Sequence, residues 1–87
     1  MKATVEISMY PLKREYEEAI LEFIADLKEV PGLRIKVNET STHVFGEDDV
    51  IFDALKEGIR SAWTKYDKTV FVMKVLGADL EGSADDL

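Results

Sequence analysis

Apolar residues in this chain recur with two different periods, and the order of these periods limits the fold. Four short segments alternate apolar and polar side chains or are almost wholly apolar, as strands do, and two longer segments repeat apolar residues at helical spacing. In chain order they are strand 3–10, helix 14–30, strands 33–39 and about 42–46, helix 49–66 and strand 68–77. This order predicts an α+β fold, the ferredoxin-like βαββαβ sandwich, with a four-stranded antiparallel sheet and both helices on one face.

Turn residues and charges mark the ends of several segments. Pro11 follows the first strand and cannot donate to a sheet, because proline has no N–H. Pro31 and Gly32 end the first helix, and Asp48 and Asp49 are expected to cap and charge the start of the second. The second helix is expected to bury a stripe made of Ile51, Phe52, Leu55, Ile59, Ala62, Trp63 and Tyr66.

Two facings stay open from the sequence. Val44 and Phe45 are adjacent and both apolar, so either side chain could point toward the core. In the last strand, alternation leaves two sets for the face without helices. They are Val70, Val72 and Lys74, or Phe71, Met73 and Val75.

Length and composition place one small domain in the chain. The sequence has 87 residues, and the domain is expected to span 1–78. Residues 79–87 carry four acidic side chains and little apolar surface, so they are predicted to form a flexible tail. A domain of this size has a thin core and often gains stability by oligomerisation.

Charge and cysteine content exclude several classes of function. The net charge of −7 argues against a nucleic-acid partner. The absence of cysteine excludes disulfides and thiolate chemistry. Neither a signal peptide nor a run of about 20 apolar residues is recognisable. A cytoplasmic protein without a membrane partner is therefore expected.

Catalysis finds little support in the sequence. His43 is the only histidine and has no obvious orienting partner. Acidic residues and His43 show no metal-ligand spacing, and no glycine-rich phosphate loop is present. The expectation is a protein that is not an enzyme and requires no metal or cofactor.

The sheet face without helices, called the open face below, is expected to be of mixed character. If Val5, Ile7 and Met9 face the helices, the open face carries Thr4, Glu6, Ser8 and Tyr10, together with Arg34, Lys36 and Asn38. Either facing of the last strand adds apolar side chains to it. Exposed apolar patches usually mark interfaces. We therefore expect this face to be covered by a second copy of the chain, in a homodimer or homotetramer, or by a ligand.

Three stretches, EISMYPL (6–12), STHVFGEDDVIFDALKEGI (41–59) and the closing VLG (75–77), resemble the thiamine-binding YkoF-like family. The shared landmarks are Tyr10-Pro11-Leu12, Ser41-Thr42, Gly46 and Val50, Phe52, Asp53 and Ala54. The resemblance implies a ferredoxin-like domain that binds thiamine or its hydroxymethylpyrimidine moiety without chemistry. Some family members carry two such domains, so it also implies that a single-domain chain forms a dimer or a dimer of dimers.

The chemistry of an aminopyrimidine selects the candidate ligand-binding residues. Its polar edges need hydroxyl or carboxylate partners, its flat face needs an apolar wall, and a thiazolium cation is attracted to a carboxylate. The candidates are Glu6, Ser8, Tyr10, Ser41, Thr42 and Glu47. Ser8, Tyr10 and Thr42 are expected to converge, because the first and third strands are neighbours in this topology.

Plainer interpretations of the same residues stay open. Ser41 and Thr42 could be ordinary hairpin residues, and Tyr10 could be a strand-end aromatic of the core or an interface. The alternative function is a structural or regulatory oligomer that binds another small metabolite. Ligand binding separates the two hypotheses, because a ligand that binds only the folded form raises the melting temperature.

Overall fold

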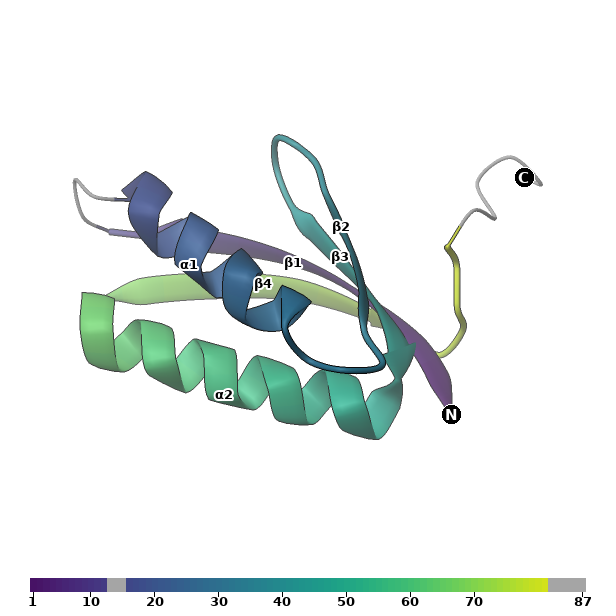
Figure 1. Cartoon of the computed structure of the whole chain (residues 1–87). Coiled ribbons are helices and arrows are strands. Elements are labelled where there is room, and N and C mark those ends of the chain that lie inside the picture. Colours follow the sequence, from purple (N-terminus) through teal and green to yellow (C-terminus); the bar gives the residue numbers. More distant parts are fainter. Residues whose placement is uncertain (13–15, 82–87) are drawn as a thin grey trace.

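The structure is a computed structural model that describes residues 1–12 and 16–81. Its elements are β1 (Lys2–Pro11), α1 (Tyr16–Lys28), β2 (Arg34–Val37), β3 (Thr42–Glu47), α2 (Asp48–Tyr66) and β4 (Thr69–Leu76). The four strands form one antiparallel sheet in the order β2-β3-β1-β4, and both helices cover the same face (Figure 1). The predicted ferredoxin-like α+β fold is confirmed. The first two residues of the predicted helix 14–30 lie outside the described residues.

The core lies between the two central strands and the helices. Val5 and Ile7 of β1 and Val44 of β3 are almost wholly buried, and they belong to one cluster with Leu27 of α1 and Ile51 of α2. Full burial of such a side chain stabilises the fold by about 1.5–3 kcal/mol. The helix-facing side of the sheet is therefore the part of the molecule that holds the fold together.

The strand register settles both open facings. Val5 lies opposite Val44, so Val44 points to the helices and Phe45 to the open face. On β4, Glu6 lies opposite Lys74 and Ser8 opposite Val72. The first of the two possible sets, Val70, Val72 and Lys74, is thus the one on the open face.

The second helix buries Ile51, Leu55 and Ala62 as predicted, but the rest of its buried stripe differs from the prediction. Its buried residues are Ile51, Ala54, Leu55, Gly58 and Ala62. Phe52, predicted in the stripe, is 45% exposed, and Trp63 is half exposed. Gly58 packs against Phe23 of α1, where an added Cβ would lie 2.9 Å from Cε1 of that ring. The buried stripe contains the small residues Ala54, Gly58 and Ala62, because α1 approaches α2 closely at this point.

The start of α2 also differs from the expected cap. The N-cap residue is Glu47, which makes no side-chain capping bond. Asp48 and Asp49 lie in the first turn, where their negative charge suits the helix N-terminus. The Asp48 carboxylate lies 3.2 Å from the N-terminal amino group, and this ion pair and hydrogen bond lower the pKa of Asp48.

Beyond β4 the chain turns back over the open face. Residues 78–81 contact side chains of β1 and β2 there, and residues 82–87 of the predicted tail lie outside the described residues. Across the described ranges, the structure contains no helix that is long and apolar enough to cross a membrane.

Candidate functional site

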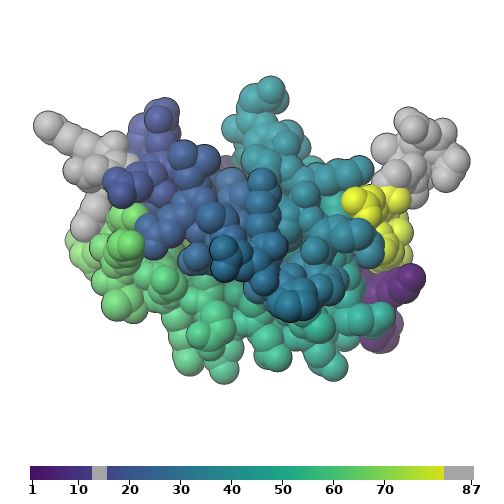
Figure 2. Space-filling view, in the orientation of Figure 1, coloured from purple at the N-terminus to yellow at the C-terminus, as the bar shows by residue number. Residues whose placement is uncertain are grey.

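A cavity of about 500 Å³ lies where β1 ends and β3 begins, on the helix side of the sheet. The end of β1, the first turns of α1 and the β2–β3 turn form its walls. Figure 2 shows the surface hollowed between α1 and the tip of this turn. Cavities that hold small organic ligands have volumes of this order, about 300–1,000 Å³.

Most of the cavity wall is apolar or aromatic. Phe23 and Ile24 of α1 are buried at its base, and Met9 of β1 adds a thioether. Tyr16 of α1, about half exposed, borders it, whereas Tyr10 lies at the end of β1 in register with Val70, so its ring is on the open face and only the strand end meets the cavity. Aromatic side chains with a polar tip suit a flat heterocycle, because they contact its face and can hydrogen-bond its edge.

The polar wall comes from the β2–β3 turn, whose shape depends on Asn38. The Asn38 Oδ1 atom accepts hydrogen bonds from the backbone N–H groups of Thr40 and Ser41, both at 2.9 Å. A side-chain amide that binds the backbone two residues ahead is typical of an Asx turn. The hydroxyls of Thr40 and Ser41 also donate to this oxygen, at 3.2 and 3.4 Å, so the polarity of this hairpin is largely a matter of turn structure.

Thr42 is the polar residue placed deepest in this site. It lies opposite Ile7 of β1, so its side chain points to the helix side and lines the cavity. The residue is only 5% exposed, and its hydroxyl makes no hydrogen bond with the part of the chain that the structure describes. This hydroxyl can both donate and accept, so it is available to a molecule in the cavity.

Ser41 connects the cavity to a polar cluster on the open face. Its Oγ donates to a carboxylate oxygen of Glu6 at 3.2 Å. The same oxygen lies 3.2 Å from Nε2 of His43, and the other lies 3.6 Å from Nζ of Lys74. The Ser41 hydrogen bond and the nearby charges of Lys74 and His43 lower the pKa of Glu6, although its desolvation acts the other way. We call these four residues the Glu6 cluster.

The structure divides the six predicted ligand-binding residues into three places. Tyr10, Ser41 and Thr42 line the cavity. Glu6 and Ser8 lie on the open face, where Ser8 Oγ donates to the Thr40 carbonyl at 3.1 Å. Thr42 lies opposite Ile7 and shares its facing toward the helices, whereas Ser8, the next residue of β1, faces the other side of the sheet. The predicted convergence of Ser8 with Thr42 is therefore wrong.

Glu47 lies far from the other candidates. It pairs with Lys2 at the opposite end of β3 from Thr42, and its carboxylate lies 3.0 Å from the N-terminal amino group. The α1 residues Tyr16, Ile20 and Phe23 were not predicted as part of the site. The sequence could have indicated them, because only a few residues separate the end of β1 from the start of α1. The first turns of this helix must therefore lie near the end of β1.

Among residues 1–12 and 16–81, no group of three or more His, Asp or Glu side chains could hold a metal ion. The polar groups of the cavity are hydroxyls, an amide and the carboxylate of Glu39. Such groups fix the orientation of an organic ligand through hydrogen bonds.

No protein-family model and no curated protein matches the chain. Several solved structures share its fold. A Thermotoga maritima protein, provisionally assigned to thiamine biosynthesis or salvage, is 23% identical, with 100% of both chains covered and a TM-score of 0.83. A Streptococcus pneumoniae protein is also 23% identical, over 99% of this chain and 97% of that one, with a TM-score of 0.84. A hypothetical protein from Methanocaldococcus jannaschii is 25% identical, over 85% and 77%, with a TM-score of 0.76.

These likenesses define the class of protein. The chain is a ferredoxin-like α+β domain, and it has a ligand-sized cavity beside the β2–β3 turn. Its structural neighbours include a protein linked to thiamine metabolism, which agrees with the resemblance of its sequence to the YkoF-like family.

Proposed function

We propose that the cavity binds thiamine or its hydroxymethylpyrimidine moiety, without chemical conversion. The observation that carries this proposal is the side chain of Thr42, a residue only 5% exposed that lines the cavity and whose hydroxyl makes no hydrogen bond with the described part of the chain. An aminopyrimidine offers both hydrogen-bond donors and acceptors, and a hydroxyl can satisfy either. Leaving such a group unpaired on binding costs about 1–3 kcal/mol, so the match selects the ligand.

The shape of the cavity supports the same class of ligand. Tyr16 offers aromatic surface at its edge, and Phe23 of α1 lines it. A planar ring can contact these side chains while its edge meets Ser41 and Thr42. The Glu39 carboxylate at the turn suits the cationic thiazolium ring of thiamine.

The sequence resemblance falls on the same residues. Two of its landmarks, Tyr10-Pro11-Leu12 and Ser41-Thr42, come from distant parts of the chain and meet at the cavity. The landmarks on α2, such as Asp53, do not line it. The thiamine-related assignment of one structural neighbour is a further support for the ligand.

We also propose that the chain acts as a homodimer or homotetramer through its open face. Val70, Val72 and Leu76 of β4 are each about half exposed there. Exposed apolar side chains on one strand face are typical of an interface, although Lys74 lies between Val72 and Leu76 here. In this proposal the protein is a cytoplasmic binding protein whose partners are its ligand and itself, with no required cofactor.

Calorimetry with thiamine and with hydroxymethylpyrimidine tests the cavity. Thr42→Val keeps the volume of the side chain and removes the hydroxyl, so we expect about tenfold weaker binding. Thr69→Val is the matched control, because Thr69 is also buried with an unpartnered hydroxyl but does not line the cavity. Its affinity should equal that of the unchanged protein.

Two results would contradict this function. Equal affinity of the Thr42→Val and Thr69→Val variants would remove Thr42 from the site. Absence of binding to either compound, with a rise in melting temperature for another metabolite, would favour the alternative of a structural or regulatory oligomer with a different ligand.

A further inference from the structure

The backbone pairing of β1 with β3 ends where the cavity begins. Ile7 and Thr42 are the last paired residues, and residues 8–11 of β1 pair with β4. Figure 1 shows the β2–β3 turn, residues 38–41, leaving the line of β1 at this point. Residues on both sides of this divergence, 9–12 and 37–42, line the cavity. The ladder of the sheet therefore does not fix how far the turn lies from the end of β1.

Two side-chain hydrogen bonds on the open face connect the turn to β1 instead. Ser8 Oγ donates to the Thr40 carbonyl at 3.1 Å, and Ser41 Oγ donates to a carboxylate oxygen of Glu6 at 3.2 Å. Glu6 and Ser8 are successive residues on the same face of β1, because side chains alternate along a strand. The cavity lies on the helix side of the sheet, so these two bonds hold the turn from the side opposite to the cavity.

The Glu6 carboxylate is itself held from both neighbouring strands. His43 of β3 and Lys74 of β4 lie opposite Glu6, with Nε2 and Nζ atoms 3.2 and 3.6 Å from its oxygens. These groups and Ser41 lower the pKa of Glu6, which favours the ionised form. A hydrogen bond to an ionised carboxylate is roughly twice as strong as one between neutral groups. The Glu6 cluster thus presents a fixed, strong acceptor to the turn.

The internal shape of the turn has its own hydrogen bonds. Asn38 Oδ1 accepts from the N–H groups of Thr40 and Ser41, and the Asn38 N–H donates to the Ser41 carbonyl at 3.0 Å. Loss of the bonds to Ser8 and Glu6 would therefore change where the turn lies more than its shape. Since the turn is one wall of the cavity, its place sets the width of the site.

We propose that Ser8 and Glu6 are positioning residues that hold the β2–β3 turn from the open face and thereby set the affinity of the cavity for its ligand. The inference rests on the proposed binding of thiamine or hydroxymethylpyrimidine. It gives a role to two residues that were predicted to bind the ligand and do not line the cavity. Hydrogen bonds weaken steeply outside a narrow range of distance and angle, so a displaced wall binds less tightly.

Calorimetry with thiamine tests this role. Ser8→Ala removes the hydroxyl and should weaken binding about fivefold, because the turn is then held less firmly. Ser8→Thr keeps a hydroxyl on a residue type that suits strands, and it should restore the affinity of the unchanged protein. Glu6→Met should act like Ser8→Ala, and Glu6→Gln, which keeps an acceptor for Ser41, should lose less.

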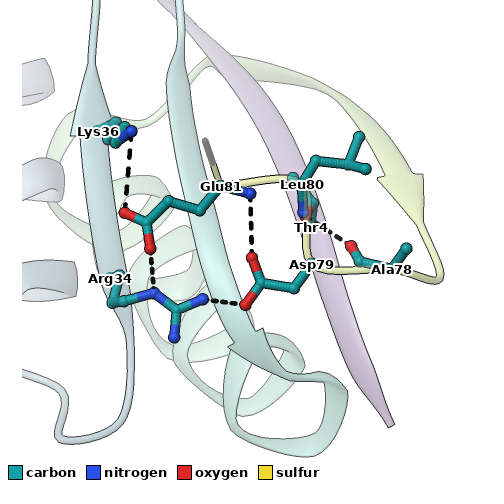
Figure 3. A network of polar contacts seen from close by, with 7 residues as sticks. All are labelled: Thr4, Arg34, Lys36, Ala78, Asp79, Leu80 and Glu81. Carbon is teal, nitrogen blue, oxygen red and sulfur yellow. Dashed lines mark hydrogen bonds and ion pairs between the residues drawn. The ribbon is translucent and has the colours of Figure 1, made fainter. Parts of the chain in front are cut away.

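Thr4→Val is the matched control at the other end of β1. The Thr4 hydroxyl donates to the Ala78 carbonyl at 2.7 Å and accepts from the Leu80 N–H at 3.0 Å (Figure 3). Like Ser8, it holds another segment of the chain against the open face, but that segment lies outside the cavity wall. Thr4→Val should leave the affinity for thiamine unchanged. Equal losses for Thr4→Val and Ser8→Ala would overturn the positioning role.

Backbone order parameters from NMR relaxation report the hold on the turn without any ligand. In Ser8→Ala, those of Thr40 and Ser41 should fall while that of Leu55 in α2 stays the same, which a general loss of stability would not produce. Unchanged order in the turn, or lower order with unchanged affinity, would overturn the inference. If the unchanged protein binds neither compound, the proposed function fails, and the order parameters alone decide whether Ser8 and Glu6 hold the turn.

Discussion

The two faces of the sheet are built from alternate residues of the same strands, yet they differ in what surrounds these residues. On the helix face, Val5 and Ile7 of β1 are almost wholly buried in the core. On the open face, Glu6 between them lies 3.2 Å from His43 Nε2, makes an ion pair with Lys74 and stays partly exposed. One face therefore stabilises the fold, and the other is available for contacts with other molecules.

The comparison teaches where function can arise in so small a domain. The helices leave the end of the sheet beside the β2–β3 turn uncovered, and the cavity lies there. At the opposite end, residues 78–81 lie against part of the open face, which no helix covers. Both proposed functions thus occupy places where helix packing stops.

The largest expected difference between the faces is in stability. Ile7→Ala should lower the free energy of unfolding by about 2–5 kcal/mol, because Ile7 is buried among helix and strand side chains. Val72→Ala, on the open face, should change it by less than about 0.5 kcal/mol in the monomer. Urea unfolding at low protein concentration measures both. Similar losses for the two variants would show that the faces do not differ as described.

A second prediction concerns the close contact between Gly46 of β3 and the residues Gly32 and Leu33 that precede β2. A Cβ at Gly46 would lie 2.9 Å from the backbone oxygen of Gly32 and equally close to Leu33 Cδ2. Gly46→Ala should therefore destabilise the protein by about 1–3 kcal/mol, since one of these contacts is backbone. Gly77→Ala is the control, because nothing lies within 4 Å of a Cβ there. Thermal unfolding of both variants checks the expectation, and equal melting temperatures would contradict it.

Much of the fold could be predicted because local patterns and the global topology agree. The alternation of Val5, Ile7 and Met9 and the helical spacing of Phe23 and Leu27 each have one simple solution. Together they fix the order of elements, and few topologies fit that order. The observed strands and helices begin and end within a few residues of the predicted ones.

The site was harder to predict, because it depends on register and on packing between distant segments. Adjacent apolar residues at Val44 and Phe45 hid the facing of β3, and with it the direction of Thr42. Phe52 lies at the border of the buried stripe of α2, where helical spacing alone does not determine whether a side chain is buried or exposed. The path of residues 78–81 over the sheet depends on contacts of Asp79 and Glu81 with Arg34, more than forty positions away.

The smallest expected effect is a difference in pH dependence between the two faces. The Ser41 hydrogen bond and the charges of Lys74 and His43 lower the pKa of Glu6 below its ordinary value of 4.5. The unfolded chain therefore binds more protons in this range, so the stabilisation by Glu6 is present above about pH 4.5 and is lost as pH falls through the lowered pKa. Glu6→Gln should unfold with a shallower loss of stability below that pH.

Other carboxylates with lowered pKa, Glu22 and Asp79, titrate in both proteins, so the difference between the two curves isolates Glu6. Glu57→Gln, an exposed change on α2, is the control and should leave the slope as it is. The measurement is the urea midpoint from pH 6 to the acid limit of folding. Parallel curves for the Glu6→Gln variant and the unchanged protein would mean that the Glu6 cluster does not persist in solution.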